Sequence, residues 1–351
     1  MAETSEFSPE EIERLEPFVS NTDRPVYVLK NLPAEVVGAI FSRYSRSPKS
    51  GRRLLLDEFL ENDESGLSVL RGDSVGGVDL ARGRDFFERI LAGYGDDSIG
   101  ELGGVHLATE DISNIAAKVI EDARIGISPL EKSSRYVSFA EKRDGKYAYL
   151  RDPDIESSKH AKTYEEACDR LFDTYSRLLD PMIEWAREKW PQEKGEDDRA
   201  YNASTKAKAL DSLRGLLPAA TLTNVGLYGN GRAFEFLLMK MQSHDLAEIR
   251  DLADRMKTEL DTEIPSMVAR ADKDNEKGQA TVAWYQGSRE TIRRFANEIS
   301  AEVTPEKCEA PGVQLLDYDP DGEEKVLAAM LYEYSALSES QLRERVASVS
   351  P

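Results

Sequence analysis

A short cluster of hydroxyls, a carboxylate and cations lies at residues 128–136, which read SPLEKSSRY, and Arg124 precedes it. Hydroxyl and guanidinium groups around one turn suit a phosphate or an anionic ring, because arginine presents a rigid fork of donors. The same spacing has a purely structural reading. Ser128 and Glu131 form a Ser-x-x-Glu capping box, with Pro129 at the first position of a helix. On spacing alone the capping box is the simpler reading, but the hydroxyls and cations that follow and precede it tip the balance toward a site for a phosphate or an anionic ring.

A second candidate is Asn230, which stands between two glycines and is followed by Arg232. It can be an ordinary helix cap beside a solvated arginine. It can also be an anion site, because free backbone N–H groups and a cation at the start of a helix favour a phosphate or pyrophosphate. A flavin dinucleotide or a nucleotide would need such a site.

The spacing of histidines, cysteines and glycines does not indicate a zinc site, a Cys-His nucleophile or a Rossmann unit. The histidines are His106, His160 and His244; no two have helical i, i+4 spacing, and neither Cys168 nor Cys308 lies beside one. We therefore predict no zinc site and no Cys-His nucleophile. No Gly-x-Gly-x-x-Gly follows a strand pattern, so a dinucleotide would bind outside a Rossmann unit.

The composition is that of a soluble globular protein dense in charge. Of 351 residues, 40% are hydrophobic and 32% are charged, and 66 acidic against 46 basic residues give a net charge of -20. This charge disfavours nucleic-acid binding and is most simply explained by solubility or salt tolerance. No apolar run is long enough for a bilayer, and the start of the chain lacks a signal-peptide pattern, so we expect no membrane contact and a cytoplasmic protein. Because the chain has only two cysteines, we expect no disulfide framework.

The elements that must position these residues follow from hydrophobic spacing. Apolar residues recur at helical intervals in several segments. Helices are predicted over residues 33–44, 112–123, 164–183, 234–241 and 249–260. Residues 135–140 and 146–150 look like two strands joined at Asp144-Gly145, a strong hairpin signal, and residues 281–285 look like another strand.

Several short motifs occur in the order found in the flavin-dependent thymidylate synthase (ThyX) family, which this chain resembles over residues 36–275. The family motif runs Arg-His-Arg, two residues, Ser, one residue, Asn-Glu, one residue, Ser, one residue, Arg-Tyr. Its later part coincides with Ser128, Glu131, Ser133, Arg135 and Tyr136, whereas Leu130 replaces the Asn and Ala123, Arg124 and Ile125 replace the Arg-His-Arg.

Matches also lie before and after this segment. Ser98 and Glu101 fit a Gly-His-x-Ser-x-x-Glu stretch in which Asp96 replaces the histidine. Later matches are Arg214 to Pro218 for Arg-x-x-Leu-Pro, Asn230-Gly-Arg232 for Asn-x-Arg, and Ser243-His244 through Ile249 for Ser-His-x-x-x-Glu-Ile. Lys240 replaces the arginine that stands four residues before this histidine in the family.

The resemblance implies an α+β fold with a central antiparallel sheet or hairpin and several long helices. It also implies a homotetramer with FAD held between subunits, and the reductive methylation of dUMP to dTMP with methylenetetrahydrofolate and NADPH. No protein nucleophile is needed in that scheme. We expect a flexible leader at residues 1–25, a catalytic domain at 26–275 and a C-terminal extension at 276–351.

The resemblance further assigns residues to two ligands. The expected FAD contacts are Ser98, Glu101, Arg124, Ser128, Asn230, Arg232 and His244. The expected dUMP contacts are Glu131, Ser133, Ser134, Arg135, Arg214 and Lys240, with Lys240 as the catalytic group that polarises the base.

Two other functions remain open at this stage. A degenerate family member could keep the fold as a noncatalytic nucleotide-binding or partner subunit, which the altered arginines favour. An enzyme on the same scaffold could modify a different pyrimidine nucleotide, with Lys240 and Asp96 reflecting the changed substrate. A purely structural helical protein is a third reading, which the co-occurring motifs count against.

Overall fold

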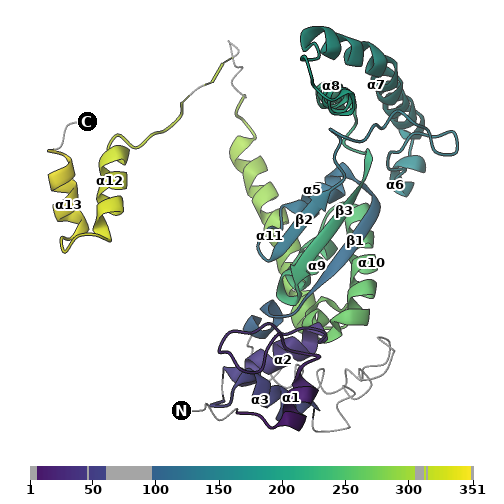
Figure 1. Ribbon diagram of the computed structural model, residues 1–351. Helices are drawn as coiled ribbons and strands as arrows, with labels where there is room; N and C mark the ends of the chain where they lie inside the picture. Colours follow the sequence, from purple (N-terminus) through teal and green to yellow (C-terminus); the bar gives the residue numbers. More distant parts are fainter. Residues whose placement is uncertain (1–5, 46, 61–96, 305–311, 314, 349–351) are drawn as a thin grey trace. The chain divides into compact units, whose positions relative to one another are not determined.

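The computed structural model describes residues 6–45, 47–60, 97–304, 312–313 and 315–348 (Figure 1). The chain divides into two compact units, Met1–Ile292 and Arg293–Pro351.

The first unit is built on a three-stranded antiparallel sheet. Its strands are β1 (Gly104–Ser113), β2 (Ile127–Glu131) and β3 (Leu222–Asn230), in the order β1-β3-β2. The central strand is therefore the last in sequence, and it pairs with segments about one hundred residues away. The register joins Thr109 to Val225 and Ser128 to Tyr228. Together with the helices around it, this sheet confirms the predicted α+β class.

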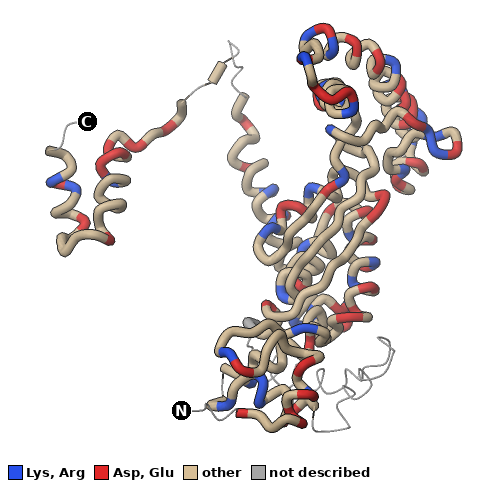
Figure 2. The backbone as a smooth tube through the Cα atoms, in the orientation of Figure 1, with Lys and Arg blue, Asp and Glu red and all other residues tan. Residues whose placement is uncertain are grey.

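The sheet has one covered face and one open face. Val225 and Leu227 of β3 are buried, whereas Gly226 and Tyr228, which alternate with them, are exposed. Side chains alternate across a strand, so only one face belongs to the core. The helices α5 (Asn114–Glu121), α9 (Gly231–Gln242) and α10 (Ala247–Glu263) contact the strands. Figure 2 shows that β3 carries no charged residue, although acidic and basic residues are spread over the surrounding helices.

The amino-terminal segment is part of the main core. Its elements are α1 (Pro9–Leu15), α2 (Ala34–Tyr44), and α3 (Gly51–Leu54), which continues as a π-helix at Leu55–Leu60. The prediction of a flexible leader is wrong for residues 6–25, because four apolar side chains of this segment are buried in the core and Ser8 starts α1 with a capping box. The buried side chains are Phe7, Leu15, Phe18 and Val19.

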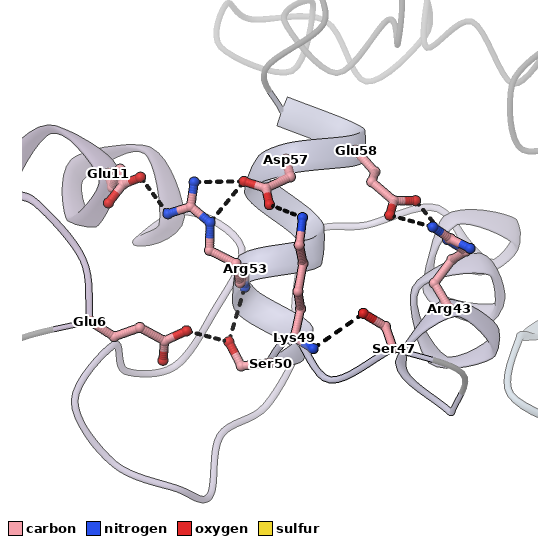
Figure 3. A network of polar contacts seen from close by, with 9 residues as sticks. All are labelled: Glu6, Glu11, Arg43, Ser47, Lys49, Ser50, Arg53, Asp57 and Glu58. Carbon is pink, nitrogen blue, oxygen red and sulfur yellow. Dashed lines mark hydrogen bonds and ion pairs between the residues drawn. The ribbon is translucent and has the colours of Figure 1, made fainter.

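Ion pairs join these first helices to one another (Figure 3). Arg53 lies between Asp57 and Glu11, at 2.6 Å from each carboxylate. Arg43 of α2 makes two hydrogen bonds of 2.8 Å to Glu58 in the π-helix. The hydrogen bonds from Arg53 hold the pKa of Asp57 below its usual value. The pairing therefore connects α1 and α2 to the helix that follows them.

A second cluster of buried side chains, rich in aromatic residues, lies under α7 (Ala161–Lys189) and α8 (Asp198–Leu213). Tyr147 stacks on Phe172 with ring centroids 4.8 Å apart, and Tyr149 and Tyr175 are fully buried beside them. The long helix predicted at residues 164–183 is confirmed. Cys168 of this helix is a free thiol in the same cluster, and burial raises its pKa.

The predicted hairpin at residues 135–150 is only partly right. Asp144 and Gly145 do form a tight turn with φ values of 50° and 78°, and Arg143 forms a bridge to Lys146 across it. The flanking segments form no strands, because their aromatic side chains pack on α7, and Tyr149 bridges to Thr221 instead.

The capping box predicted at Ser128 is wrong, since residues 127–131 form β2. Pairing with β3 outweighs the local helix-start signal. Pro129, which has no N–H to donate, is tolerated because β2 is an edge strand.

The strand predicted at residues 281–285 is also wrong, because it lies inside α11 (Glu276–Ser300). Val282 packs on the main core, while Trp284 is exposed, so the segment has a one-sided helical pattern. The helix predicted at residues 249–260 is confirmed as α10, and that at 234–241 as α9. The short helices η6 (Pro265–Met267) and η7 (Ala269–Ala271) join α10 to α11.

The second unit contains a pair of helices, α12 (Gly322–Tyr332) and α13 (Glu339–Val346), which bury Ala328, Leu342 and Val346. The predicted domain boundaries at residues 25 and 275 stay predictions. In the described parts of both units, no helix is long and apolar enough to cross a membrane.

Candidate functional site

A cavity of about 540 Å³ lies between α9 and the loop that precedes β2, and we call it the α9 cavity. It collects five residues that the motifs singled out, from three separate parts of the chain. Its lining consists of Glu101, Asp122, Ala123, Arg124, Ile125, Gly126, Asn230, Arg232, Ala233, Phe236, Leu237 and Lys240.

The start of α9 shapes one wall of this cavity. Asn230 ends β3 and caps α9, accepting a hydrogen bond of 2.8 Å from the N–H of Ala233. The predicted helix cap is thereby confirmed. Gly126 has a φ of 80° and lies so close that an added Cβ would be 2.7 Å from the Cβ of Ala233. A glycine is therefore needed there for the loop to reach the helix.

Two cations that line the α9 cavity have no carboxylate partner among the residues that the structure describes. Arg232 forms a 2.5 Å ion pair with Glu101, and its guanidinium lies over Phe236 at 5.8 Å from the ring centroid. By contrast, Arg124 and Lys240 are exposed, and neither forms an ion pair with any residue in the described part of the chain. The apolar side chains of Phe236 and Leu237 complete a wall suited to a flat ring beside an anionic group.

A second, smaller cavity of about 240 Å³ lies along β2, and we call it the β2 cavity. It contains Glu131 and Ser134, two of the predicted dUMP contacts. Burial raises the pKa of Glu131, and the nearby carboxylate of Glu121 adds to the effect. Lys132 lies over the ring of Phe139 at 5.1 Å from its centroid. The complete lining is Asn114, Lys118, Glu121, Glu131, Lys132, Ser134, Phe139, Leu217, Thr221 and Thr223.

Two arginines expected to contact dUMP meet at one carboxylate oxygen. Oδ1 of Asp211 lies 3.4 Å from Nε of Arg135 and 3.1 Å from an Nη of Arg214. All three side chains are about half exposed. The neighbouring Ser133 accepts a hydrogen bond from the N–H of Arg135, so its hydroxyl supports the turn that carries this arginine.

Three predicted FAD contacts are not placed in the α9 cavity. Ser128 is exposed on the open face of the sheet, opposite Tyr228. His244 accepts a hydrogen bond from the N–H of Leu246, and burial lowers its pKa. Ser98 lies in the short helix Asp97–Glu101, and its side chain is outside the described part of the structure.

Sequence reasoning missed Asp211 and the apolar wall of the α9 cavity. Asp211 stands three residues before Arg214, a spacing at which side chains meet on a helix, so this signal was available. Phe236 and Leu237 were part of an ordinary helical pattern, and nothing in that pattern distinguished the cavity wall from the core.

The fold and these two cavities define an α+β protein whose cavities are lined by cationic and apolar side chains. Residues 49–266 match the model of the family described as thymidylate synthase complementing protein. Since the match spans more than half of the chain, the protein belongs to this family.

Its relatives include proteins described only as UPF0159. The chain is 46% identical to the one from Chlamydia muridarum over 336 residues, covering 95% of this chain and 63% of the relative. It is 32% identical to the one from Thermoplasma acidophilum, covering 85% of this chain and 59% of the relative. The chain thus spans less than two thirds of the length of these relatives.

Among solved structures, one similar chain is the UMP/dUMP methylase PolB from Streptomyces cacaoi bound with 5-Br dUMP. The sequence identity is 14% and the TM-score is 0.41, over 67% of this chain and 88% of that one.

Proposed function

We propose that this chain is a flavin-dependent thymidylate synthase, which reductively methylates dUMP to dTMP with methylenetetrahydrofolate and NADPH. Membership of the family supports the proposal. The observation that carries it is the α9 cavity, where Glu101 and Arg124 line one space with Asn230, Arg232 and Lys240 of the α9 segment. Three separate parts of the sequence thus contribute motif residues to one cavity.

The residues of the α9 cavity fit the family's flavin. A flavin dinucleotide has a flat ring and a pyrophosphate, and the cavity offers an apolar wall, a helix start and uncommitted cations. The Cβ that Gly126 lacks would fill the junction between the loop and α9, which keeps the cavity open there. When bound, FAD would supply hydride transfer, while Arg124, Asn230 and Arg232 would hold it.

The base of dUMP would lie near Lys240, whose ammonium would stabilise negative charge that develops on the pyrimidine ring. Arg135 and Arg214 would hold the phosphate, with Glu131, Ser133 and Ser134 nearby. Ser98, Ser128 and His244 would contact FAD from other subunits or after rearrangement, in a cytoplasmic homotetramer. The family resemblance motivates these assignments.

The test combines a spectrum with a turnover measurement. The purified protein is incubated with FAD and freed of excess, and its visible spectrum is recorded. Tritium release from dUMP labelled at the methylated carbon is then followed with methylenetetrahydrofolate and NADPH. Flavin retention with tritium release supports the proposal. A colourless protein that retains no FAD would contradict it.

A matched pair of variants separates the two ligands. Arg135→Ala is expected to weaken dUMP binding while FAD retention stays at the wild-type level. Arg124→Gln is expected to reduce FAD retention. Arg187→Gln on α7, far from both sets in sequence, serves as the charge-matched control. Unchanged dUMP affinity in Arg135→Ala would show that the assignment of the phosphate site is wrong.

A second candidate is a noncatalytic nucleotide-binding subunit of the same family. The observation that favours it is the wall formed by Ala123 and Ile125, which stand where the family has charged side chains; Ile125 is 96% exposed. This protein would bind dUMP or FAD and release no tritium under any of the conditions above.

A further inference from the structure

One carboxylate oxygen of Asp211 bridges the two arginines assigned to the substrate's phosphate. Its Oδ1 lies 3.4 Å from Nε of Arg135 and 3.1 Å from an Nη of Arg214. Arg135 comes from the segment after β2, and Asp211 and Arg214 come from the end of α8. The two guanidinium groups thus converge on a single negatively charged oxygen, as they would on an oxygen of a phosphate.

The ion pairs of Asp211 contribute little to the stability of the fold. The three side chains are 41–53% exposed, and exposed ion pairs contribute little to folding because water competes for both partners. Breaking them to admit another anion therefore has a small cost. Asp211 and Arg214 are about one helical turn apart, which places the carboxylate beside Arg214, and Arg135 reaches the same oxygen from the segment after β2.

We propose that Asp211 occupies the phosphate position in the ligand-free protein and acts as an internal competitor for phosphate-bearing ligands. The carboxylate keeps the two guanidinium groups converged when no ligand is present. A phosphate dianion must displace it, so the affinity for the ligand reflects an exchange of one anion for another. Asp211 is in this sense a specificity-determining residue, because a monoanion replaces it less readily than a dianion does.

The inference rests on the proposed function for the identity of the nucleotide, but its physical content concerns phosphate alone. A carboxylate about 5 Å from a phosphate dianion repels it enough, even at the dielectric constant of water, for roughly a tenfold change in affinity. Removing the charge of Asp211 should tighten phosphate binding by about that factor.

The test measures three probes by titration calorimetry at low ionic strength: dUMP, inorganic phosphate and deoxyuridine. The proteins are the wild type, Asp211→Asn, and Asp180→Asn, which removes the same charge from an exposed position on α7. Asp211→Asn is expected to bind dUMP and phosphate roughly tenfold more tightly. Deoxyuridine, which lacks the phosphate, should bind all three proteins equally, and Asp180→Asn should behave as the wild type.

Two further variants keep the test decisive. Asp211→Ala should show the same gain if Asn itself disturbs the turn, with thermal unfolding as a check of folding. Adding Arg214→Gln to Asp211→Asn should remove the gain.

Phosphate or dUMP binding that is unchanged or weaker in Asp211→Asn would overturn the inference, and so would an equal gain in Asp180→Asn. Absence of phosphate binding in every variant would overturn it as well. If the protein shows no dUMP methylation while Asp211→Asn still binds phosphate more tightly, the proposed function fails and the inference stands.

Discussion

Replacing Lys240 by glutamine removes one of the two uncommitted cations of the α9 cavity while keeping a polar side chain of similar length. Two unit charges 4 Å apart interact by about 1 kcal/mol in water and about 4 kcal/mol at an effective dielectric constant of about 20. Lys240 is exposed but lines a cavity, so we expect a value near the lower end, about 1–2 kcal/mol. This corresponds to a roughly 5- to 30-fold loss of turnover.

If Lys240 stabilises charge that develops on the base during the reaction, the loss should appear in kcat for tritium release. KM for dUMP should change less, because the ground-state base is neutral. Lys240→Arg should turn over equally fast or faster, since it restores a planar, two-pronged donor. The control is Lys277→Gln, an exposed lysine of α11.

Two results would contradict this role of Lys240. A wild-type kcat in Lys240→Gln would show that the ammonium plays no part in the chemistry. A clear loss of turnover in Lys240→Arg would show that lysine is adapted to a different substrate, which favours action on another pyrimidine nucleotide.

The remaining predictions concern the scaffold. Phe234→Ala should lower the free energy of unfolding by about 3–5 kcal/mol, measured with denaturant, because the ring is fully buried; a loss below 1 kcal/mol would argue against this packing. Gly145→Ala should cost about 1 kcal/mol because of its positive φ, whereas Gly215→Ala, with open space around it and no such φ, should cost less; equal losses would contradict the turn. The lowered pKa of Asp57 means that its pairing with Arg53 stabilises the fold above the unfolded-state pKa of about 4, and that this stability is lost as the pH falls through the lower folded-state pKa. The difference in unfolding free energy between wild type and Arg53→Gln should therefore shrink below about pH 4, and a constant difference would show that Asp57 is not involved.

Local patterns predicted the helices but not the strands. The helix at residues 164–183 and the helices after β3 follow from apolar residues at helical spacing, which depends only on neighbours in sequence. The strand β2 does not, because residues 128–131 carry a helix-start signal, and only pairing with β3, about one hundred residues later, makes them a strand. For the same reason, the strand prediction at residues 281–285 was wrong, because the β-branched and aromatic side chains there lie on a helix.

In the candidate site too, the sequence identified single residues but not which of them lie together. Motif order pointed to Arg124, Arg232 and Lys240 individually. Their meeting in one cavity depends on the glycine at position 126, which lets the loop approach α9, and on the β3–α9 junction at Asn230. The cap at Asn230 could be read from sequence neighbours, whereas the approach of the Gly126 loop to α9 could not. The role of Asp211 likewise emerged only when the structure brought Arg135 to the end of α8.

The proposed function requires the α9 cavity to bind a flavin that serves thymidylate synthesis. The most direct measurement is tritium release from labelled dUMP by FAD-loaded protein, with methylenetetrahydrofolate and NADPH, comparing wild type with Arg124→Gln and Arg187→Gln. Tritium release is expected from the wild type and Arg187→Gln, whereas Arg124→Gln should lose both tritium release and bound flavin. Wild-type flavin content and activity in Arg124→Gln would contradict the placement of the cofactor, and no release by fully loaded wild-type protein would contradict the proposed reaction.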